Sequence, residues 1–172
     1  MTYAIQVFGG EEDNTISLCR VILENTDSDV LSDIYYPEIE RRKKFHGEWH
    51  VVKEKMFPGY IFMETNDVER LWRDLTKVPK FTKLIGAGND PVALSEKEIS
   101  FITGTTGSDH IAEVSTGIIE GDKLIITSGP LVGKEGLVKK IDRHKRTALL
   151  EMEMFGRTIN MTMGLEVTDK KL

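Results

Sequence analysis

The sequence predicts an α+β protein, in which an antiparallel sheet covered by helices on one face is followed by a small all-β barrel. Strand-like and helix-like patterns alternate as far as residue 101, whereas short strands separated by turns follow at regular intervals from Gly117. A small, polar stretch at residues 103–109 separates the two patterns. The length of 172 residues suits one large or two small domains.

A strand and a helix open the chain. Residues 2–8 alternate in polarity as a strand does and stop at a Gly-Gly pair. The helix expected next begins with acidic residues, which suit its positive N-terminal dipole, and it carries four apolar residues at helical spacing. Cys19 is one of these four and is the only cysteine, so a disulfide within the chain is excluded and a packed core thiol is expected.

A second strand is predicted over residues 30–39, and a strongly basic run follows it at residues 41–44. His46 and Gly47 then mark a turn. We expect residues 38–55 to form an exposed hairpin or a mobile loop, because their charge density is too high for a buried one.

Residues 54–63 are expected to form the turn and the central strand of the first sheet. Tyr60 and Phe62 are two positions apart and therefore project from the same face of that strand. One interpretation is a strand packed within the core. Because Phe57 adds a third aromatic ring, the other interpretation is an apolar patch on the uncovered sheet face that needs a partner.

Two helices and a further strand complete the first domain. A capping box at residues 66–69 predicts a helix over residues 67–76, and residues 81–85 are expected to form the next strand. A second capping box, at residues 95–98, opens a short helix that ends at Phe101. The order strand, helix, strand, strand, helix, strand is ferredoxin-like and leaves one sheet face open.

The pattern predicts three parts: a first domain at residues 1–104, a linker at 105–115 and a barrel at 116–172. Small polar residues without periodicity indicate the linker. The strands of the barrel are expected at residues 123–127, 135–141, 147–154, 158–162 and 165–167.

The net charge of −5 argues against indiscriminate coating of nucleic acid, but the charge is unevenly distributed. Residues 134–146 hold six Lys or Arg and only two acidic residues. One interpretation of this basic segment is a solvated loop, and the other is a turn that binds phosphates. Phe155 is the only aromatic residue of residues 116–172, which favours a folded RNA over unpaired bases that require stacking.

Several classes of protein are disfavoured. The apolar runs are too short to cross a membrane and no basic leader precedes the first strand, so a cytoplasmic location is expected. His46 and His50 have no third ligand beside them, so no metal site is expected. Residues 86–88 and 108–110 lack the context of a phosphate-binding loop and of a nucleophile, so neither a catalytic residue nor a cofactor is expected.

Two separate stretches resemble one family. Residues 8–11, 57–60, 78–79 and 84–86 resemble the N-terminal domain of NusG, whereas residues 121–123, 129–133, 136–138 and 141–142 resemble a KOW motif. The resemblance covers nearly the whole chain and implies a ferredoxin-like NusG N-terminal domain followed by a small all-β KOW barrel. Residues 141–146, 151–157 and 163–166 look like the LoaP-type processive antiterminator paralogs. The chain departs from housekeeping NusG at Thr2, where a Trp is common, and in the basic hairpin.

The resemblance implies that the first domain binds RNA polymerase, at the β′ clamp helices through a hydrophobic patch and at the β gate loop. The patch would consist of Phe57, Pro58, Gly59, Tyr60, Phe62, Leu84 and Ile85. Gate-loop contacts would come from Arg70 and Trp72, in a helix that lacks the His-Thr-Thr pattern. The factor would act on transcription elongation and antitermination by binding, without catalysis.

The resemblance to LoaP implies that the KOW domain binds a structured hairpin in the nascent leader RNA. The residues expected to make this contact are Lys139, Lys140, Arg143, His144, Lys145, Arg146 and Arg157. Two alternatives stay open. A general NusG-type elongation factor would bind Rho or a ribosomal protein through this domain, and ribosome-associated proteins also carry KOW motifs.

Overall fold

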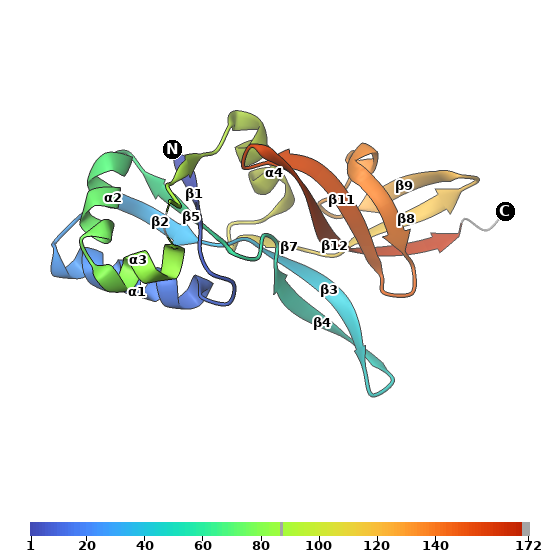
Figure 1. The fold of residues 1–172 in the computed structure, drawn as a ribbon. Helices are drawn as coiled ribbons and strands as arrows, with labels where there is room; N and C mark the ends of the chain where they lie inside the picture. The colour runs from blue at the N-terminus through green and yellow to red at the C-terminus, as the bar shows by residue number, and fades with distance from the viewer. Residues whose placement is uncertain (87, 170–172) are drawn as a thin grey trace. The chain divides into compact units, whose positions relative to one another are not determined.

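The computed structural model describes residues 1–86 and 88–169 and divides the chain into two compact units (Figure 1). The first unit consists of residues 1–36 and 57–99, and the second contains residues 37–56 together with the chain from Ser100 onward. This grouping differs from the boundary expected after residue 104, because the inserted hairpin belongs by its contacts to the second unit.

The first unit is built on a four-stranded antiparallel sheet. It contains β1 (Thr2–Gln6), β2 (Leu31–Tyr35), β5 (Tyr60–Thr65) and β6 (Val92–Ala93), in the order β2-β5-β1-β6. The central position of β5 was predicted and is confirmed. The order is that of a ferredoxin-like sheet, in which the first and third strands of the motif are central neighbours.

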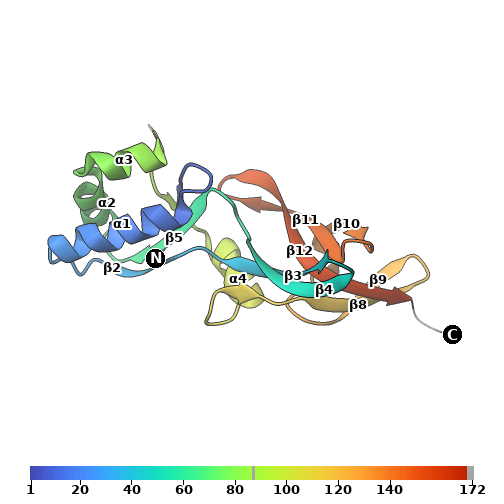
Figure 2. The same cartoon turned by 90° about the horizontal axis from the view of Figure 1, so that it is seen from below.

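Three helices lie on one face of this sheet: α1 (Glu12–Asn25), α2 (Val68–Thr76) and α3 (Pro79–Ile85) (Figure 2). Between the helices and the sheet lies one apolar core, to which β1 and β5 contribute Ile5, Ile61 and Met63. Cys19 is fully buried in it, as its helical spacing predicted. Alternation along β5 therefore turns Phe62 toward the opposite face.

The strand predicted at residues 81–85 is wrong, because these residues form α3. Val78 is extended at the N-cap and Pro79 occupies the first turn, where its fixed φ and missing N–H are tolerated. Phe81 and Ile85 are four residues apart and both are buried, which is a helical spacing. The fourth strand of the sheet is instead the short β6.

One of the two predicted capping boxes is confirmed, and the other is displaced by one residue. Helix α2 is capped by Asp67, whose Oδ1 accepts a hydrogen bond from the Arg70 backbone N at 3.0 Å, so the prediction of Asn66 was wrong by one residue. The Ser95 Oγ accepts from the Glu98 backbone N at 3.2 Å, as predicted. Helix α4 (Glu96–Thr105) continues past the expected end at Phe101 into the region predicted as a linker.

The second unit contains a five-stranded sheet in the order β10-β11-β12-β8-β9. Its strands are β8 (Ser115–Glu120), β9 (Lys123–Ser128), β10 (Val138–Asp142), β11 (Thr147–Met154) and β12 (Arg157–Asp169). The two strands expected at 158–162 and 165–167 are one continuous strand, and residues 135–137 form the 3₁₀ helix η1 instead of a strand. Among the described residues β10 and β9 are the sheet edges, so a closed barrel stays a prediction.

The hairpin predicted at residues 38–55 is confirmed as β3 (Glu38–Phe45) and β4 (Glu48–Lys55). His46 and Gly47 form its turn with φ values of 49° and 81°. Within the second unit β3 pairs in parallel with β7 (Ile111–Ala112) and contacts β12 (Figure 1). A Cβ atom at Gly164 of β12 would lie 2.5 Å from the carbonyl oxygen of Glu40, so the close approach of the two strands requires this glycine.

Candidate functional site

A buried carboxylate fixes the turn that leads into β5. The Tyr60 backbone N donates to the Phe57 carbonyl at 3.2 Å, and Gly59 has a φ of 87°, which favours glycine. The Gly59 backbone N donates to Oε2 of Glu12 at 3.1 Å, and the Gly59 carbonyl accepts from the Val7 backbone N at 2.8 Å. Only 1% of the surface of Glu12 is exposed, so the start of α1 holds the turn from inside the first unit.

The structure divides the predicted polymerase-binding aromatics into two groups. Pro58 is exposed and Tyr60 is half-buried, whereas Phe57 and Phe62 are buried. The Phe62 ring meets the edge of Tyr35 at a centroid distance of 5.8 Å and lies 5.9 Å from the Phe57 ring. The expectation that Phe62 projects from an open sheet face is therefore wrong, since its side chain is fully enclosed.

Tyr35 is a residue of this face that no sequence pattern indicated. It lies opposite Phe62 in the register of β2 and β5, which no local pattern reveals. Burial raises the pKa of Tyr35 to about 12, and the neighbouring charges of Glu64 and Asp33 act in the same direction. The phenol is therefore neutral at physiological pH.

Phe8 supplies an exposed aromatic ring beside the turn. Its side chain is 56% exposed, and its backbone N donates to the Leu84 carbonyl at 2.9 Å. Leu84 is half-buried, whereas Ile85, its neighbour in α3, is buried in the core. We call Phe8, Pro58, Tyr60 and Leu84 the turn surface, because backbone hydrogen bonds join the three segments that carry them.

The two predicted gate-loop residues lie on α2. Arg70 is exposed, with its Nη1 3.7 Å from Oδ1 of Asp29. Trp72 is half-buried and meets the Phe81 ring edge-on at a centroid distance of 5.5 Å. Trp72 therefore contributes to the packing of α2 on α3, and Arg70 is the more accessible of the two.

Several of the predicted RNA-binding residues of the second unit lie in the turn between β10 and β11. The Asp142 carboxylate accepts a hydrogen bond from the Lys145 backbone N at 2.9 Å, and this bond lowers the pKa of Asp142. The turn closes at Arg146, whose φ is 54°. It presents Arg143, His144 and Lys145 to solvent, and we call these three residues the basic turn.

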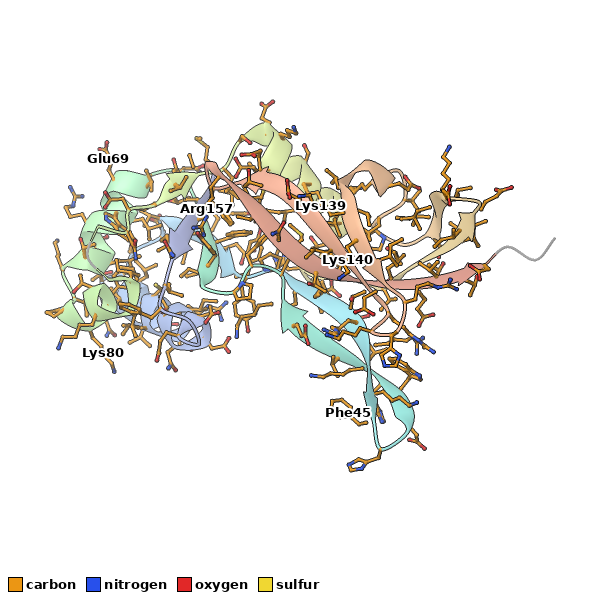
Figure 3. The ribbon with its side chains drawn as sticks, turned by 45° about the vertical axis from the view of Figure 1, so that its right-hand side comes forward. Phe45, Glu69, Lys80, Lys139, Lys140 and Arg157 are labelled. Atoms are coloured by element: carbon orange, nitrogen blue, oxygen red, sulfur yellow. The ribbon has the colours of Figure 1, made fainter. Side chains whose placement is uncertain are left out.

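The predicted RNA-binding set is not one cluster. Arg157, which is labelled in Figure 3, begins β12 opposite Met154 at the far end of β11. Seven strand residues separate this end from the basic turn, which corresponds to about 23 Å along the strand. Lys139 forms an ion pair with Glu151, whereas Lys140 is exposed on β10. The structure therefore brings Lys140 and residues 143–146 to one end of the sheet and leaves Arg157 at the other.

Arg146 has a different environment from the other cations. Its guanidinium carbon lies 3.9 Å from the centroid of the Trp49 ring in β4. Its Nη1 is 3.4 Å from Oε1 of Glu166, which also forms an ion pair with Arg42 of β3. Arg146 thus joins the inserted hairpin to the five-stranded sheet, whereas only an RNA contact was expected for it.

The described residues contain no group of three or more His, Cys, Asp or Glu that could hold a metal ion. A groove of about 550 Å³ between α1 and α3 is lined by Glu11, Asn14, Ser17, Leu18, Val21, Lys80 and Leu84. The titratable side chains of this lining are Glu11 and Lys80. No helix in the described part of the chain is long and apolar enough to span a membrane.

Comparisons with known proteins identify the family of this chain. The family model described as "Transcription termination factor nusG" matches residues 3–103. The "Transcription termination/antitermination protein NusG" of Helicobacter pylori strain J99 is 26% identical over 160 residues, covering 91% of this chain and 90% of its own. The protein of the same name from Thermus thermophilus is 32% identical over 119 residues, covering 64% and 65%.

Among solved structures, "Domain interaction in Thermotoga maritima NusG" shares the fold. It has a TM-score of 0.55 and 19% identity, and the match covers 95% of this chain and 92% of that one. The family model alone covers more than half of the residues. The chain therefore belongs to the NusG family of transcription termination and antitermination factors.

Proposed function

We propose that the first unit binds RNA polymerase through the turn surface, at the coiled clamp helices of β′. The observation that carries this proposal is the rigid turn at Gly59, which presents Pro58 and Tyr60 within the region that matches the NusG family model. Exposed aromatic and apolar residues around a fixed turn suit the centre of a protein interface. Phe57 and Phe62 are buried, so we assign them to packing beneath the turn and not to the contact with polymerase.

The proposed mechanism needs no chemical reaction. A factor that bridges the clamp and the β gate loop binds the closed polymerase cleft better than the open one, and so shifts the population away from paused states. Arg70 and Trp72 are the proposed contacts to the gate loop. Arg70 is better placed for it, because its side chain is exposed on α2.

The second unit is proposed to bind a structured hairpin in nascent RNA, as a LoaP-type antiterminator would. Support comes from the basic turn with Lys140 behind it, since these cations suit the closely spaced phosphates of an A-form helix. The ion pair between Arg143 and Asp169 is exposed and therefore weak. Exchanging the Asp169 carboxylate for an RNA phosphate as the partner of Arg143 costs little free energy. Arg157 and Lys139 are secondary candidates, because one is distant and the other is paired.

A general NusG-type factor, in which this unit binds Rho or a ribosomal protein, is the second candidate. The observation that favours it is the number of predicted RNA-binding cations already paired: Lys139 with Glu151, Arg143 with Asp169 and Arg146 with Glu166. These pairs reduce the positive potential of the face.

The test uses the full chain. A gel shift with the cognate leader hairpin and a scrambled hairpin of equal length should show preference for the leader, and R143A/K145A should remove this preference. Retention on immobilised core polymerase should be unchanged in that variant. Equal affinity for both hairpins would leave only the general NusG-type function.

A further inference from the structure

Two basic segments that are a hundred residues apart in sequence lie together in the second unit. Residues 41–50 hold four Lys or Arg and one Glu, and residues 142–146 hold three Lys or Arg and one Asp. The stacking of Arg146 on Trp49 and the pairing of Glu166 with both Arg42 and Arg146 join them. The hairpin, of which Figure 3 labels Phe45, is thereby attached next to the basic turn.

The register of the hairpin assigns its two lysines near the tip to different faces. Lys44 lies directly opposite Trp49, and Lys43 lies opposite His50. Directly opposite residues of an antiparallel pair share a face, so Lys44 is on the face that Arg146 contacts. Lys43 is on the other face, where its Nζ lies 5.7 Å from the centroid of the Phe45 ring.

The cations divide by function as well as by position. Arg42 and Arg146 are partly buried and share the Glu166 carboxylate, which suits a structural joint. Lys44 of the hairpin and the basic turn of the five-stranded sheet are both exposed. The paired guanidinium groups of Arg42 and Arg146 fix the geometry, while the exposed ammonium and guanidinium groups are available to an external anion.

We propose that the inserted hairpin is a second wall of the RNA-binding face, with Lys44 contacting a phosphate of the same RNA that the basic turn binds. Arg146 is a positioning residue in this arrangement, because its stacking on Trp49 sets the distance between the two walls. The inference rests on the proposed RNA binding and adds a contact from a segment outside the KOW-like sequence. The partner is a double-stranded stem, whose two phosphate backbones match two separated walls.

The experiment measures fluorescence anisotropy of the full chain with a labelled RNA stem-loop between about 50 and 200 mM salt. K44A should weaken binding and make the slope of log K against log salt shallower by about one. The matched control is K43A, which removes the same charge from the opposite face and should leave the slope at its wild-type value. W49A should also weaken binding, and W49F should restore it, because a ring remains for Arg146.

The outcomes separate this inference from the proposed function. If R143A/K145A weakens binding while K44A and K43A behave alike, the hairpin is outside the RNA-binding face and only the inference fails. If K44A weakens binding while R143A/K145A does not, the basic turn is not the RNA-binding site, and both the proposed RNA binding by this turn and the present inference fail. Tighter binding by W49A would show that the hairpin masks Arg146, and tighter binding to a DNA stem-loop would exclude RNA as the ligand. Either result overturns the two-walled RNA face.

Discussion

The carboxylate of Glu12 accepts a hydrogen bond from the backbone N of Gly59 at 3.1 Å, which links the first helix to a turn 47 residues away. Glu12 is almost fully buried, so this bond lies in a medium where an unsatisfied polar group is costly. The shape of the Pro58-Gly59 turn therefore depends on α1. From the sequence, the acidic residues at the start of α1 were expected only to suit the helix dipole, and the contact of Glu12 with the turn requires the folded structure.

Replacing Glu12 with Ala should destabilise the first unit and distort the turn surface. The Gly59 N–H would lose its acceptor, which costs about 1–3 kcal/mol in the free energy of unfolding. E12Q is the matched control, because an amide oxygen can still accept this bond. Urea unfolding and retention on immobilised polymerase would both be measured, and an E12A variant as stable as wild type would refute a structural role for the bond.

Tyr60 and Phe62 should behave differently when truncated. Y60A removes a half-exposed ring of the turn surface and should weaken polymerase binding by about 2 kcal/mol, roughly 30-fold. F62A removes a fully buried ring and should cost about 3–5 kcal/mol in folding stability. Loss of binding by F62A would therefore not identify a contact, whereas a folded Y60A variant with unchanged polymerase affinity would contradict the assignment of the turn surface.

Local patterns predicted much of this fold. Alternating polarity located β1, helical spacing located α1 with Cys19 inside, and the His46-Gly47 turn located the inserted hairpin. Each depends on residues within a few positions of one another, so sequence alone suffices. The strand expected at 81–85 was wrong, because an apolar run of this length fits both the two-residue period of a strand and the 3.6-residue period of a helix. Pro79 in the first turn favours the helix.

The parts of the candidate sites that were not predicted depend on contacts between distant residues. Phe62 is buried and packs against Tyr35, which lies opposite it in the register of β2 and β5. Arg146 resembled the other basic residues of its turn, yet Trp49 and Glu166, far away in sequence, give it a structural contact. Charge counts predict which segment is basic, but only the folded partners decide which cations are exposed.

Cys19 should be unreactive in the folded protein. It is fully buried, and burial raises its pKa to about 12, so almost no thiolate exists at pH 8. Iodoacetamide should modify it only after the first unit unfolds, and the rate should rise with urea along the unfolding transition. Rapid labelling in native buffer would indicate that α1 opens locally.

The basic turn should stay ordered in mild acid. Because hydrogen bonding to the Lys145 backbone N lowers the pKa of Asp142, the stabilisation is present above the ordinary aspartate value of about 3.9 and is lost as pH falls through the lower folded value. The Lys145 amide signal in an NMR titration should therefore move with a midpoint below the ordinary aspartate pKa. D142A should abolish this titration, and D142N, which keeps an acceptor oxygen, should preserve the turn at neutral pH. A midpoint at or above the ordinary value would contradict the hydrogen bond.

The two halves of the chain are predicted to be joined by a cleavable segment at residues 105–115, of which residues 106–110 lie between α4 and β7. Proteinase K should cut there, because Gly107, Ser108 and Asp109 are exposed. The fragments should nevertheless co-elute in gel filtration, since β3 of the first fragment pairs with β7 and packs on β12 of the second.

The control for this cleavage is G164A. A Cβ atom at residue 164 would meet the Glu40 carbonyl oxygen and the Arg41 backbone, so β3 has to move away from β12. After cleavage, the G164A protein should therefore separate into two fragments in gel filtration, whereas the cleaved wild type should not. Each separated fragment should remain folded, as judged by the secondary-structure signal in its circular dichroism spectrum. Separation of the wild-type fragments under the same conditions would show that the hairpin does not hold the second unit together.

The site of cleavage tests the predicted linker itself. Cleavage at the His46-Gly47 turn in place of residues 106–110 would show that the hairpin tip is the more accessible segment, and would count against the predicted linker.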